Sequence, residues 1–535
     1  MATESSTPSE SPPSDETAPD LAGIDVGERE ALESISHGAV VSFGGMSAER
    51  VMYFLTNLVL TRALGVVVYG LYAFAWQLTN IVLRFAPLGS TATLVKYVSA
   101  ATDDAERGRI AGLAYATTLT VSVALAIALW VGAPAINAAT LNAPRFTTLL
   151  RILAVGLPVF AVVRVHVFLF RAVEAVNDQV LVDYLLRPGV NLLAVVGALA
   201  LGLAIEGVLA GLVLATVLLG VVLVPVALSR TGVRPTLRGA GGEVRRFFNH
   251  AAPNALTGVS MLLRTRIDVL LIGYLIADAA AAQATGIYNV ALLLVNIAVI
   301  PLLAFNQLMP PVASRLWENG ETGTLDAVYT TITRLIVTTT VPLVAIQVAY
   351  GPELLGLFGP EFREGYLVLL VFMAGRLVGN GVGATGWLLL MTEHQYARLA
   401  LDWFLAVLNV VLSVFFVLEF GLVGAALGTS SSIAIQNLLQ VIVLRRYEGL
   451  FPFDWTFLKP LGAGLGAMGV MWSLRAVLEG LGLLLVGSLV GTLAFVVFLR
   501  ALGLQQRDVF VWRALSERYR AVARKAAPAW VASVL

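Results

Sequence analysis

Long apolar runs constrain the fold of this chain more than any other feature. Hydrophobic residues make up 58% of its 535 residues and charged residues only 13%, whereas a soluble domain carries about 25% charged residues. A helix needs about 20 apolar residues to cross the roughly 30 Å hydrocarbon core of a bilayer. The sequence therefore predicts an all-α integral membrane protein. Its fourteen predicted transmembrane helices lie near residues 38–61, 70–94, 110–133, 148–170, 180–203, 207–229, 250–276, 285–310, 327–350, 366–391, 399–418, 422–444, 460–478 and 481–500.

An internal repeat divides these spans into two groups. The stretch GLYAFAWQLTNIVLRFAPLG begins at Gly70, and GIYNVALLLVNIAVIPLLAF begins at Gly286. An ungapped alignment of the two pairs identical residues at Gly70/Gly286, Tyr72/Tyr288, Ala75/Ala291, Leu78/Leu294, Asn80/Asn296 and Ile81/Ile297. Internal repeats of this kind are common in alternating-access carriers. We therefore expect two pseudo-symmetric six-helix lobes followed by two C-terminal helices.

Polar segments suggest where the domains begin and end. The acidic N-terminal segment lacks the apolar core of a signal peptide after a basic start, so it is interpreted as a disordered tail. The predicted segments are the cytoplasmic tail (1–36), an N-lobe (37–229), a basic cytoplasmic linker (230–246), a C-lobe (247–446), two further spans (447–505) and an amphipathic cytoplasmic tail (506–535).

Basic residues in the connections between spans predict the orientation. They gather in alternate connections, and the opposite set contains only Arg62, Arg145 and Arg363. Because cytoplasmic loops are enriched in Arg and Lys, both termini are expected in the cytoplasm. A strong preference for Arg over Lys and an acidic N-terminal segment are typical of a GC-rich, halophilic source. The predicted location is the plasma membrane of a prokaryote, either bacterial or archaeal.

Charged side chains inside the predicted spans are the candidate functional residues. Each costs about 2.5–3.5 kcal/mol at mid-membrane on insertion scales, so each needs a partner or a function. Arginine suits phosphate because its planar fork donates two hydrogen bonds at once. The substrate-binding candidates are Arg50, Arg84, Arg164, Arg264, Arg266 and Arg376. Glu49 and Asp268 are candidates for coupling to H⁺ or Na⁺.

A structural interpretation of the same charges competes with the functional one. Ion pairs between spans would hold the bundle together, and for Arg50, Arg84, Arg264 and Arg266 the two interpretations are evenly matched. The structural interpretation is favoured for Arg334, which lies near the end of a predicted span.

Several kinds of site are missing from the sequence. The chain contains no Cys, so it forms no disulfide and no thiolate metal site. Neither the phosphate-binding loop of nucleotide hydrolases nor an H-E-x-x-H zinc motif occurs. The longest external segment, near 351–365, is short for an enzyme that joins glycans outside the cell. We expect no enzymatic activity, no metal, no cofactor other than a coupling ion and no nucleic-acid partner.

Two short stretches resemble a known family. LTRALG followed by YGLYA resembles the turn after the first span of polysaccharide and oligosaccharide flippases, which belong to the multidrug/oligosaccharidyl-lipid/polysaccharide exporter superfamily. GYLIADAAAAQATGIYNVA is similar to the second-half copy of that turn, and the resemblance covers about residues 36–505. One departure is Val66–Val68, where the family usually has proline and acidic residues.

The resemblance implies how the chain binds its substrate. Flippases of this superfamily hold the headgroup with arginines on the first, second, seventh and eighth spans. Arg50 and Arg84 match the first and second spans, and Arg264 and Arg266 match the seventh. The eighth predicted span has no Arg before Arg315 at its cytoplasmic end, so that part of the pattern is not met.

The sequence therefore favours a flippase. Its predicted cargo is a polyprenyl- or dolichyl-phosphate-linked oligosaccharide, used for cell-surface polysaccharide or glycoprotein assembly. Membrane lipids and other glycan-assembly proteins are further candidate partners. One alternative is an ion-coupled multidrug or metabolite antiporter of the same superfamily, although the excess of intramembrane Arg over Asp and Glu counts against it. The other is a non-transporting membrane component of glycan assembly, either an enzyme or a scaffold.

Overall fold

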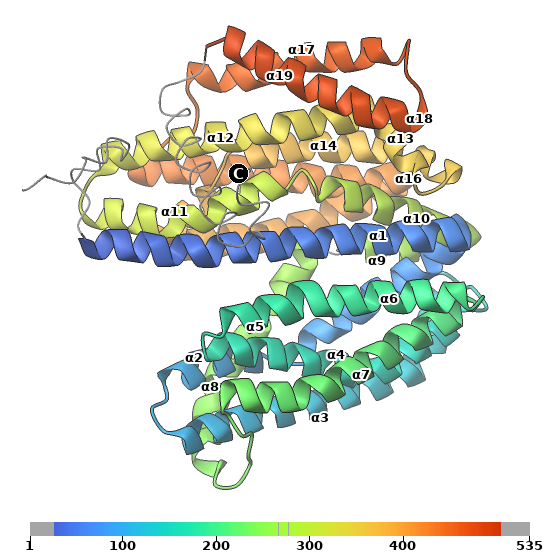
Figure 1. Ribbon diagram of the computed structural model, residues 1–535, viewed down its shortest axis with the longest axis vertical. Coiled ribbons are helices and arrows are strands. Elements are labelled where there is room, and N and C mark those ends of the chain that lie inside the picture. Colours follow the sequence, from blue (N-terminus) through green and yellow to red (C-terminus); the bar gives the residue numbers. More distant parts are fainter. Residues whose placement is uncertain (1–25, 266, 277, 504–535) are drawn as a thin grey trace, which may run out of the picture.

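The protein is described from a computed structural model, which places residues 26–265, 267–276 and 278–503. These residues are helical, contain no strand and form two lobes (Figure 1). The first half contains α1 (Val26–Phe85), α2 (Ser90–Ala100), α3 (Asp104–Ala139), α4 (Phe146–Ala172), α5 (Val176–Val180), the π-helical turn η1 (Leu181–Leu186), α6 (Arg187–Ala200) and α7 (Ile205–Thr231).

The second half begins with α8 (Gly241–Thr265). It continues through α9 (Ile267–Leu275), α10 (Asp278–Val295), α11 (Ile300–Glu318), α12 (Thr322–Ala349), α13 (Gly351–Gly356), η2 (Pro360–Gly365), α14 (Tyr366–Gly381), α15 (Thr385–Met391) and α16 (Gln395–Glu448). The last elements are η3 (Trp455–Phe457), α17 (Leu458–Leu474), α18 (Gly480–Gly482), η4 (Leu483–Gly487) and α19 (Ser488–Ala501).

The helix lengths confirm the predicted membrane fold. In the part of the chain that the structure describes, nine helices are long and apolar enough to cross a bilayer, or ten if the bent pair α10–α11 counts as one span. Two of the nine are broken at a glycine with positive φ, namely α1 at Gly65 (φ 73°) and α16 at Gly421 (φ 55°). Glycine adopts this conformation without the clash that a Cβ would cause. The two broken helices therefore each supply two of the predicted spans.

Large apolar side chains on the outside of the bundle support the same conclusion. Leu193 is 71% exposed, Leu201 79% and Val131 70%. Extended apolar surface of this kind is rare on soluble monomers and marks an interaction surface. Here this surface would contact the lipid.

The two copies of the repeat meet where α1 and α10 cross. A Cβ built on Gly70 would lie 1.7 Å from the carbonyl oxygen of Ala282, and one built on Gly286 would lie 2.7 Å from the carbonyl oxygen of Val66. Both positions therefore need glycine, because the backbones of α1 and α10 cross in direct contact. The buried Phe74 extends this contact by packing against Gly273 of α9.

The connection between the lobes is packed against the N-lobe. The amide of Thr236 donates to the carbonyl of Gly108 in α3 (2.9 Å), and Arg246 pairs with Glu106 (2.7 Å). That hydrogen bond raises the pKa of the Arg246 guanidinium above its usual value. The segment predicted as a linker (230–246) thus docks onto α3, and α8 then packs against α9 and α16 of the C-lobe.

The N-terminal boundary also differs from the predicted one. Helix α1 begins at Val26, inside the segment 1–36 that is predicted to be a tail. The amphipathic helix predicted within 506–535 lies outside the described residues.

Candidate functional site

Three arginines from three helices gather in the N-lobe. Arg84 lies in the last turn of α1, Arg164 lies in α4, and Arg187 begins α6. The charges of Arg84 and Arg187 both act on Arg164. The Arg164 guanidinium also lies 6.0 Å from the centre of the Phe168 ring. The structure thus brings together two of the sequence-predicted substrate arginines and adds a third.

Two carboxylates partly neutralise this cluster. Arg187 pairs with Asp183 one turn earlier (3.0 Å) and with Glu49 of α1 (3.4 Å). All three side chains are partly exposed, at 39% for Arg187, 23% for Asp183 and 33% for Glu49. Glu49, a predicted coupling residue, therefore already holds an ion pair between two helices. Three arginines and two carboxylates thus lie together in this part of the N-lobe.

Arg187 was not among the predicted substrate-binding residues. It lies close to the end of a predicted span, where a cation usually reaches the membrane surface. A sequence signal was nevertheless present, because Asp183 and Arg187 have the i, i+4 spacing of an ion pair on one helix face.

Arg50 points away from its neighbour Glu49. Its guanidinium donates to the backbone carbonyl of Asn296 (3.2 Å), in the break between α10 and α11. A broken helix leaves carbonyls without their usual amide partners, and these accept bonds from side chains. Successive residues of α1 thus contact different lobes, Glu49 the N-lobe and Arg50 the C-lobe.

The C-lobe holds a buried carboxylate. Asp268 is 3% exposed, and its carboxylate accepts hydrogen bonds from the Tyr288 hydroxyl (2.5 Å) and the Val269 amide (2.9 Å). The Thr429 hydroxyl of α16 lies 3.5 Å away. Arg376 of α14 lies near enough for the charge of Asp268 to act on it. The predicted residues Asp268 and Arg376 therefore belong to one cluster, separate from the N-lobe arginines.

Two of the predicted arginines fall outside the described residues. The structure describes neither residue Arg266 nor the side chain of Arg264. Their predicted role on the seventh span stays a prediction.

A further contact between the halves was not foreseen from the sequence. Arg62 of α1 donates to the backbone carbonyls of Leu357 (2.6 Å) and Gly356 (3.2 Å) at the end of α13. Nearby, Asn289 of α10 donates to the buried Tyr69 hydroxyl (2.6 Å), which donates to Asn57 (2.7 Å). These bonds join the N-terminal half to the C-lobe at the end of the bundle where the repeated glycines cross.

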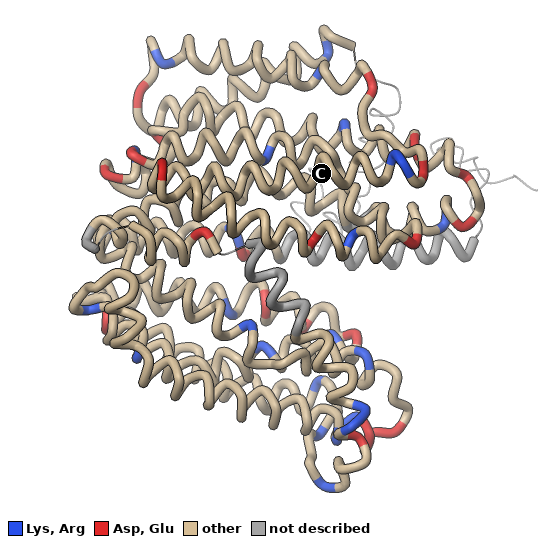
Figure 2. The backbone as a smooth tube through the Cα atoms, turned by 180° about the vertical axis from the view of Figure 1, so that it is seen from behind, with Lys and Arg blue, Asp and Glu red and all other residues tan. Residues whose placement is uncertain are grey.

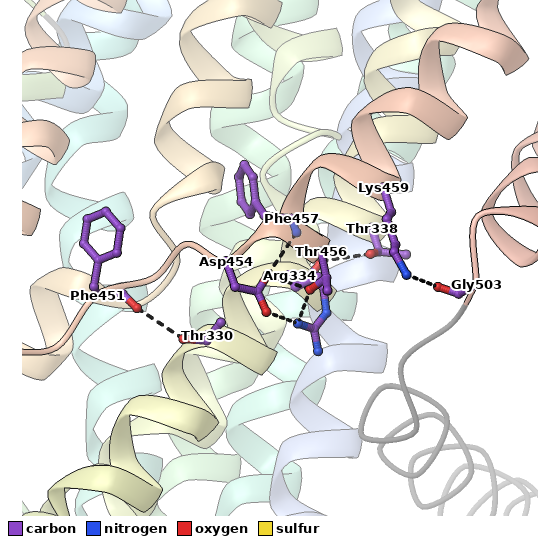
Figure 3. Close-up of polar contacts among 9 residues, drawn as sticks. All are labelled: Thr330, Arg334, Thr338, Phe451, Asp454, Thr456, Phe457, Lys459 and Gly503. Carbon is purple, nitrogen blue, oxygen red and sulfur yellow. Dashed lines mark hydrogen bonds and ion pairs between the residues drawn. The ribbon is translucent and has the colours of Figure 1, made fainter.

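Arg334 is buried and holds two segments of the chain together. It is 4% exposed and donates to Asp454 (3.1 Å) and to the Thr456 hydroxyl (2.7 Å) (Figure 3). Both acceptors lie in the loop before α17, so this arginine ties the two C-terminal spans to α12. This agrees with the structural interpretation that the sequence favoured.

The arrangement of charges defines what the site can bind. Most Lys and Arg positions lie at helix ends, and a smaller group lies inside the N-lobe (Figure 2). Partly exposed guanidinium groups attract anions, and phosphate oxygens match their paired donors. The cluster therefore suits an anion.

The fold places this chain in a defined class of membrane protein. A lipid II flippase, MurJ, in an inward closed conformation superimposes with a TM-score of 0.68 at 13% identity, covering 88% of this chain and 100% of that one. An inward-facing multidrug-resistance transporter of the MATE family gives a TM-score of 0.60 at 16% identity and covers 77% of this chain and 98% of that one. The chain has the fold of these two proteins, and the second belongs to the superfamily that the sequence resembles.

The family match is more specific. The chain belongs to the polysaccharide biosynthesis protein family, whose model matches residues 59–364. A third structure, a transporter of the same superfamily from Pyrococcus furiosus, gives a TM-score of 0.53 at 14% identity and covers 78% of this chain and 96% of that one. A comparison with curated proteins gives no match.

Proposed function

We propose that this protein is a flippase that moves a polyprenyl- or dolichyl-phosphate-linked oligosaccharide across the plasma membrane of a prokaryote. The observation that carries the proposal is the arginine cluster of the N-lobe, where Arg84, Arg164 and Arg187 of three helices gather. A drug antiporter for cations would instead need a carboxylate-rich wall. The family match to polysaccharide biosynthesis and the fold shared with a lipid II flippase support the same cargo class.

The phosphate is the group that the cluster would hold. A lipid-linked phosphate or diphosphate carries the negative charge, and the guanidinium forks of Arg84 and Arg164 would each donate paired hydrogen bonds to it. The Glu49–Arg187 ion pair would keep the third arginine in place beside them. The lipid tail would stay in the bilayer, because its apolar chain gains nothing from entering a charged site.

Alternating access would supply the movement. In the proposed orientation both termini face the cytoplasm, and the crossing of Gly70 and Gly286 lies toward the outside. For the site to open outward, the bonds from Arg62 to Gly356 and Leu357 must break. The loss of those bonds would be offset by bonds to water, so each contributes only about 1 kcal/mol to holding this end closed.

A coupling ion would act in the C-lobe. We propose Asp268 for this role, since a buried carboxylate can exchange H⁺ or Na⁺ when the access side changes. Glu49 stays a second candidate, although its bond to Arg187 gives it a structural task as well. No enzymatic step and no other cofactor belongs to this proposal.

The test uses cells that lack the gene and measures which leaflet holds the lipid-linked glycan. We expect accumulation in the cytoplasmic leaflet, reversed by the wild-type gene. Arg84→Ala and Arg164→Ala, at matched expression, should lower export by about tenfold each, since a charge-assisted hydrogen bond contributes about 1.5–3 kcal/mol.

Arg151→Ala is the matched control. Arg151 lies on α4 as Arg164 does, but its guanidinium lies 5.5 Å from the Trp130 ring, so its loss should leave export unchanged. A normal leaflet distribution without the gene would contradict the flippase and favour the antiporter. Full restoration by both arginine variants would assign those arginines to helix packing.

A further inference from the structure

An aromatic segment joins the C-lobe to the last two long helices. It reads FPFDWTF, residues 451–457, and lies between the end of α16 at Glu448 and the start of α17 at Leu458. Lys459 in the first turn of α17 donates to the carbonyl of Gly503 after α19 (2.9 Å) (Figure 3). The segment therefore lies at the end of the bundle where α17 begins and α19 ends.

Three polar side chains of α12 hold this segment. Asp326 accepts a hydrogen bond from the Phe451 amide (2.9 Å), and the Thr330 hydroxyl donates to the Phe451 carbonyl (3.2 Å). Arg334 donates to the carboxylate of Asp454 (3.1 Å) (Figure 3). The three side chains are spaced four residues apart, so they lie along one face of the helix. The segment therefore runs along α12 in a fixed register.

The segment is also held by contacts within it. The Asp454 carboxylate accepts hydrogen bonds from the Phe457 amide (3.0 Å) and the Thr456 hydroxyl (2.5 Å). The ring of Phe453 lies 5.2 Å from that of Phe451 and 4.9 Å from that of Phe457, measured between ring centres. These contacts fix the direction in which each side chain of the segment points.

Trp455 lies on the outside of this arrangement. Its side chain is 87% exposed, the largest exposed fraction of any large apolar side chain in the described part of the chain. Asp454 and Thr456, the residues on either side of it, both bond Arg334. Leu458, at the start of α17, is 53% exposed. The contacts with α12 thus hold the neighbours of Trp455 and leave the indole ring uncovered, which is typical of an interaction surface.

The register along α12 gives the depth of the indole. Arg334 lies eight residues, or about 12 Å, further along the helix than Asp326, which comes directly before the predicted span 327–350. The layer between the hydrocarbon core and the water is about 5–8 Å thick on each side, since a bilayer of about 40–45 Å contains a core of about 30 Å. Because Asp454 bonds Arg334, the adjacent Trp455 lies near the inner edge of this layer.

We propose that Trp455 anchors α17 and α19 in the interfacial layer of the bilayer, and that the contacts with α12 hold it at this depth. The partner is the lipid surface. The ring packs against the glycerol groups and the first acyl carbons, and the indole N–H donates to headgroup oxygens or water. Tryptophan suits this layer because its ring is largely apolar and its N–H is polar. This role depends neither on the cargo nor on the proposed transport cycle.

The absence of Cys allows a spin label to be placed at a single position. The full-length Trp455→Cys protein is labelled and reconstituted into bilayers of phosphatidylethanolamine and phosphatidylglycerol. The measurement is the collision rate of the label with oxygen, which concentrates in hydrocarbon, and with a water-soluble nickel complex. Leu193→Cys is the hydrocarbon reference, since this residue of α6 is 71% exposed, and Asp104→Cys is the water reference, at 91% side-chain exposure. We expect intermediate access of both reagents to the label at residue 455.

The other outcomes of this measurement overturn the proposal. Nickel access equal to that of Asp104→Cys would place the label in water. Oxygen access equal to that of Leu193→Cys, with no nickel access, would place it in the hydrocarbon. Protection from both reagents would show that protein covers this surface, either residues 504–535 of this chain or another protein.

A second label tests the indole itself. The label of Leu458→Cys reports the depth at which α17 begins while Trp455 is intact. Adding Trp455→Ala should shift this label toward water, and Trp455→Phe should shift it less, because a phenyl ring keeps the apolar contact. An unchanged depth in the Trp455→Ala protein would show that the indole is no anchor.

Variants of α12 test whether the polar contacts set the depth. Asp326→Ala combined with Thr330→Val removes both bonds to Phe451, so the label at residue 455 should move more freely and shift toward water. Thr338→Val is the matched control, because the Thr338 hydroxyl bonds the carbonyl of Arg334 within its own helix (2.8 Å) (Figure 3). Equal depth and mobility of the label in the two proteins would contradict the role of these contacts.

Discussion

Gly70 shows how a single residue sets the distance between two helices. Its backbone lies so close to α10 that a Cβ would fall 1.7 Å from the carbonyl oxygen of Ala282. This oxygen belongs to the backbone and not to the flexible end of a side chain, so the clash could be relieved only by moving a whole helix. The glycine that opens the repeat is thus the point where its two copies touch.

Gly70→Ala should therefore destabilise the protein strongly. Overpacking of a filled core costs about 1–3 kcal/mol, and a clash between two backbones belongs at the upper end of that range. The measurement is the melting temperature of the protein in detergent. Gly197→Ala is the control, because a Cβ on this helical glycine would meet nothing within 4 Å. It should be neutral or slightly stabilising. Equal melting temperatures for the two variants would contradict the tight crossing.

The same residue shows what the sequence could predict. Matching Gly70 with Gly286 needed only the ungapped alignment of two stretches. The contact between them was not predictable, because no local pattern states how one half packs onto the other. The candidate site shows the same limit. Arg84 and Arg164 became candidates because they lie deep in apolar runs. Arg187 was left out because it lies near the end of a predicted span, and apolar composition places such an end only to within a few residues.

At the scale of elements, the C-terminal pair of spans is an attached hairpin. Helices α17 and α19 pack on each other, and α17 packs on α12 of the C-lobe. Arg334, buried in α12, contributes a polar contact to this attachment, with Asp454 and Thr456 in the segment before α17 (Figure 3). Lys459 adds a bond to the carbonyl of Gly503 after α19 (2.9 Å).

Arg334→Ala should loosen this hairpin. Breaking a buried ion pair costs about 3–5 kcal/mol, but Asp454 is 41% exposed and can turn to water. We expect a loss of about 1–3 kcal/mol, read as a lower melting temperature. The control is Arg446→Ala, in the exposed last turn of α16. A loss no larger than that of the control would show that the hairpin does not depend on Arg334.

The sequence predicted the hairpin as two extra spans but placed Arg334 only near a membrane surface. Its partner lies 120 residues away in the chain. Hydropathy locates each span separately, so it holds no information on which loop a buried cation will meet.

At the scale of the whole molecule, the absence of Cys makes the proposed lobe movement directly testable. Arg62 in α1 and Leu357 after α13 are in contact at the end where the repeats cross, since the arginine Nε donates to the leucine carbonyl (2.6 Å). Arg62→Cys and Leu357→Cys introduced together would be the only thiols in the chain. A short bifunctional thiol reagent would then join the two lobes at this end.

If the lobes must separate there to release cargo, cross-linking should stop glycan export while leaving the amount of protein unchanged. Each single variant, treated with the same reagent, should keep its own untreated level of export, which accounts for the lost arginine. A reducible reagent adds a second control, since its cleavage should restore export. Export that continues in fully cross-linked protein would show that this end stays closed throughout transport. The site would then have to release its cargo by another route, and alternating access of rigid lobes would no longer describe the protein.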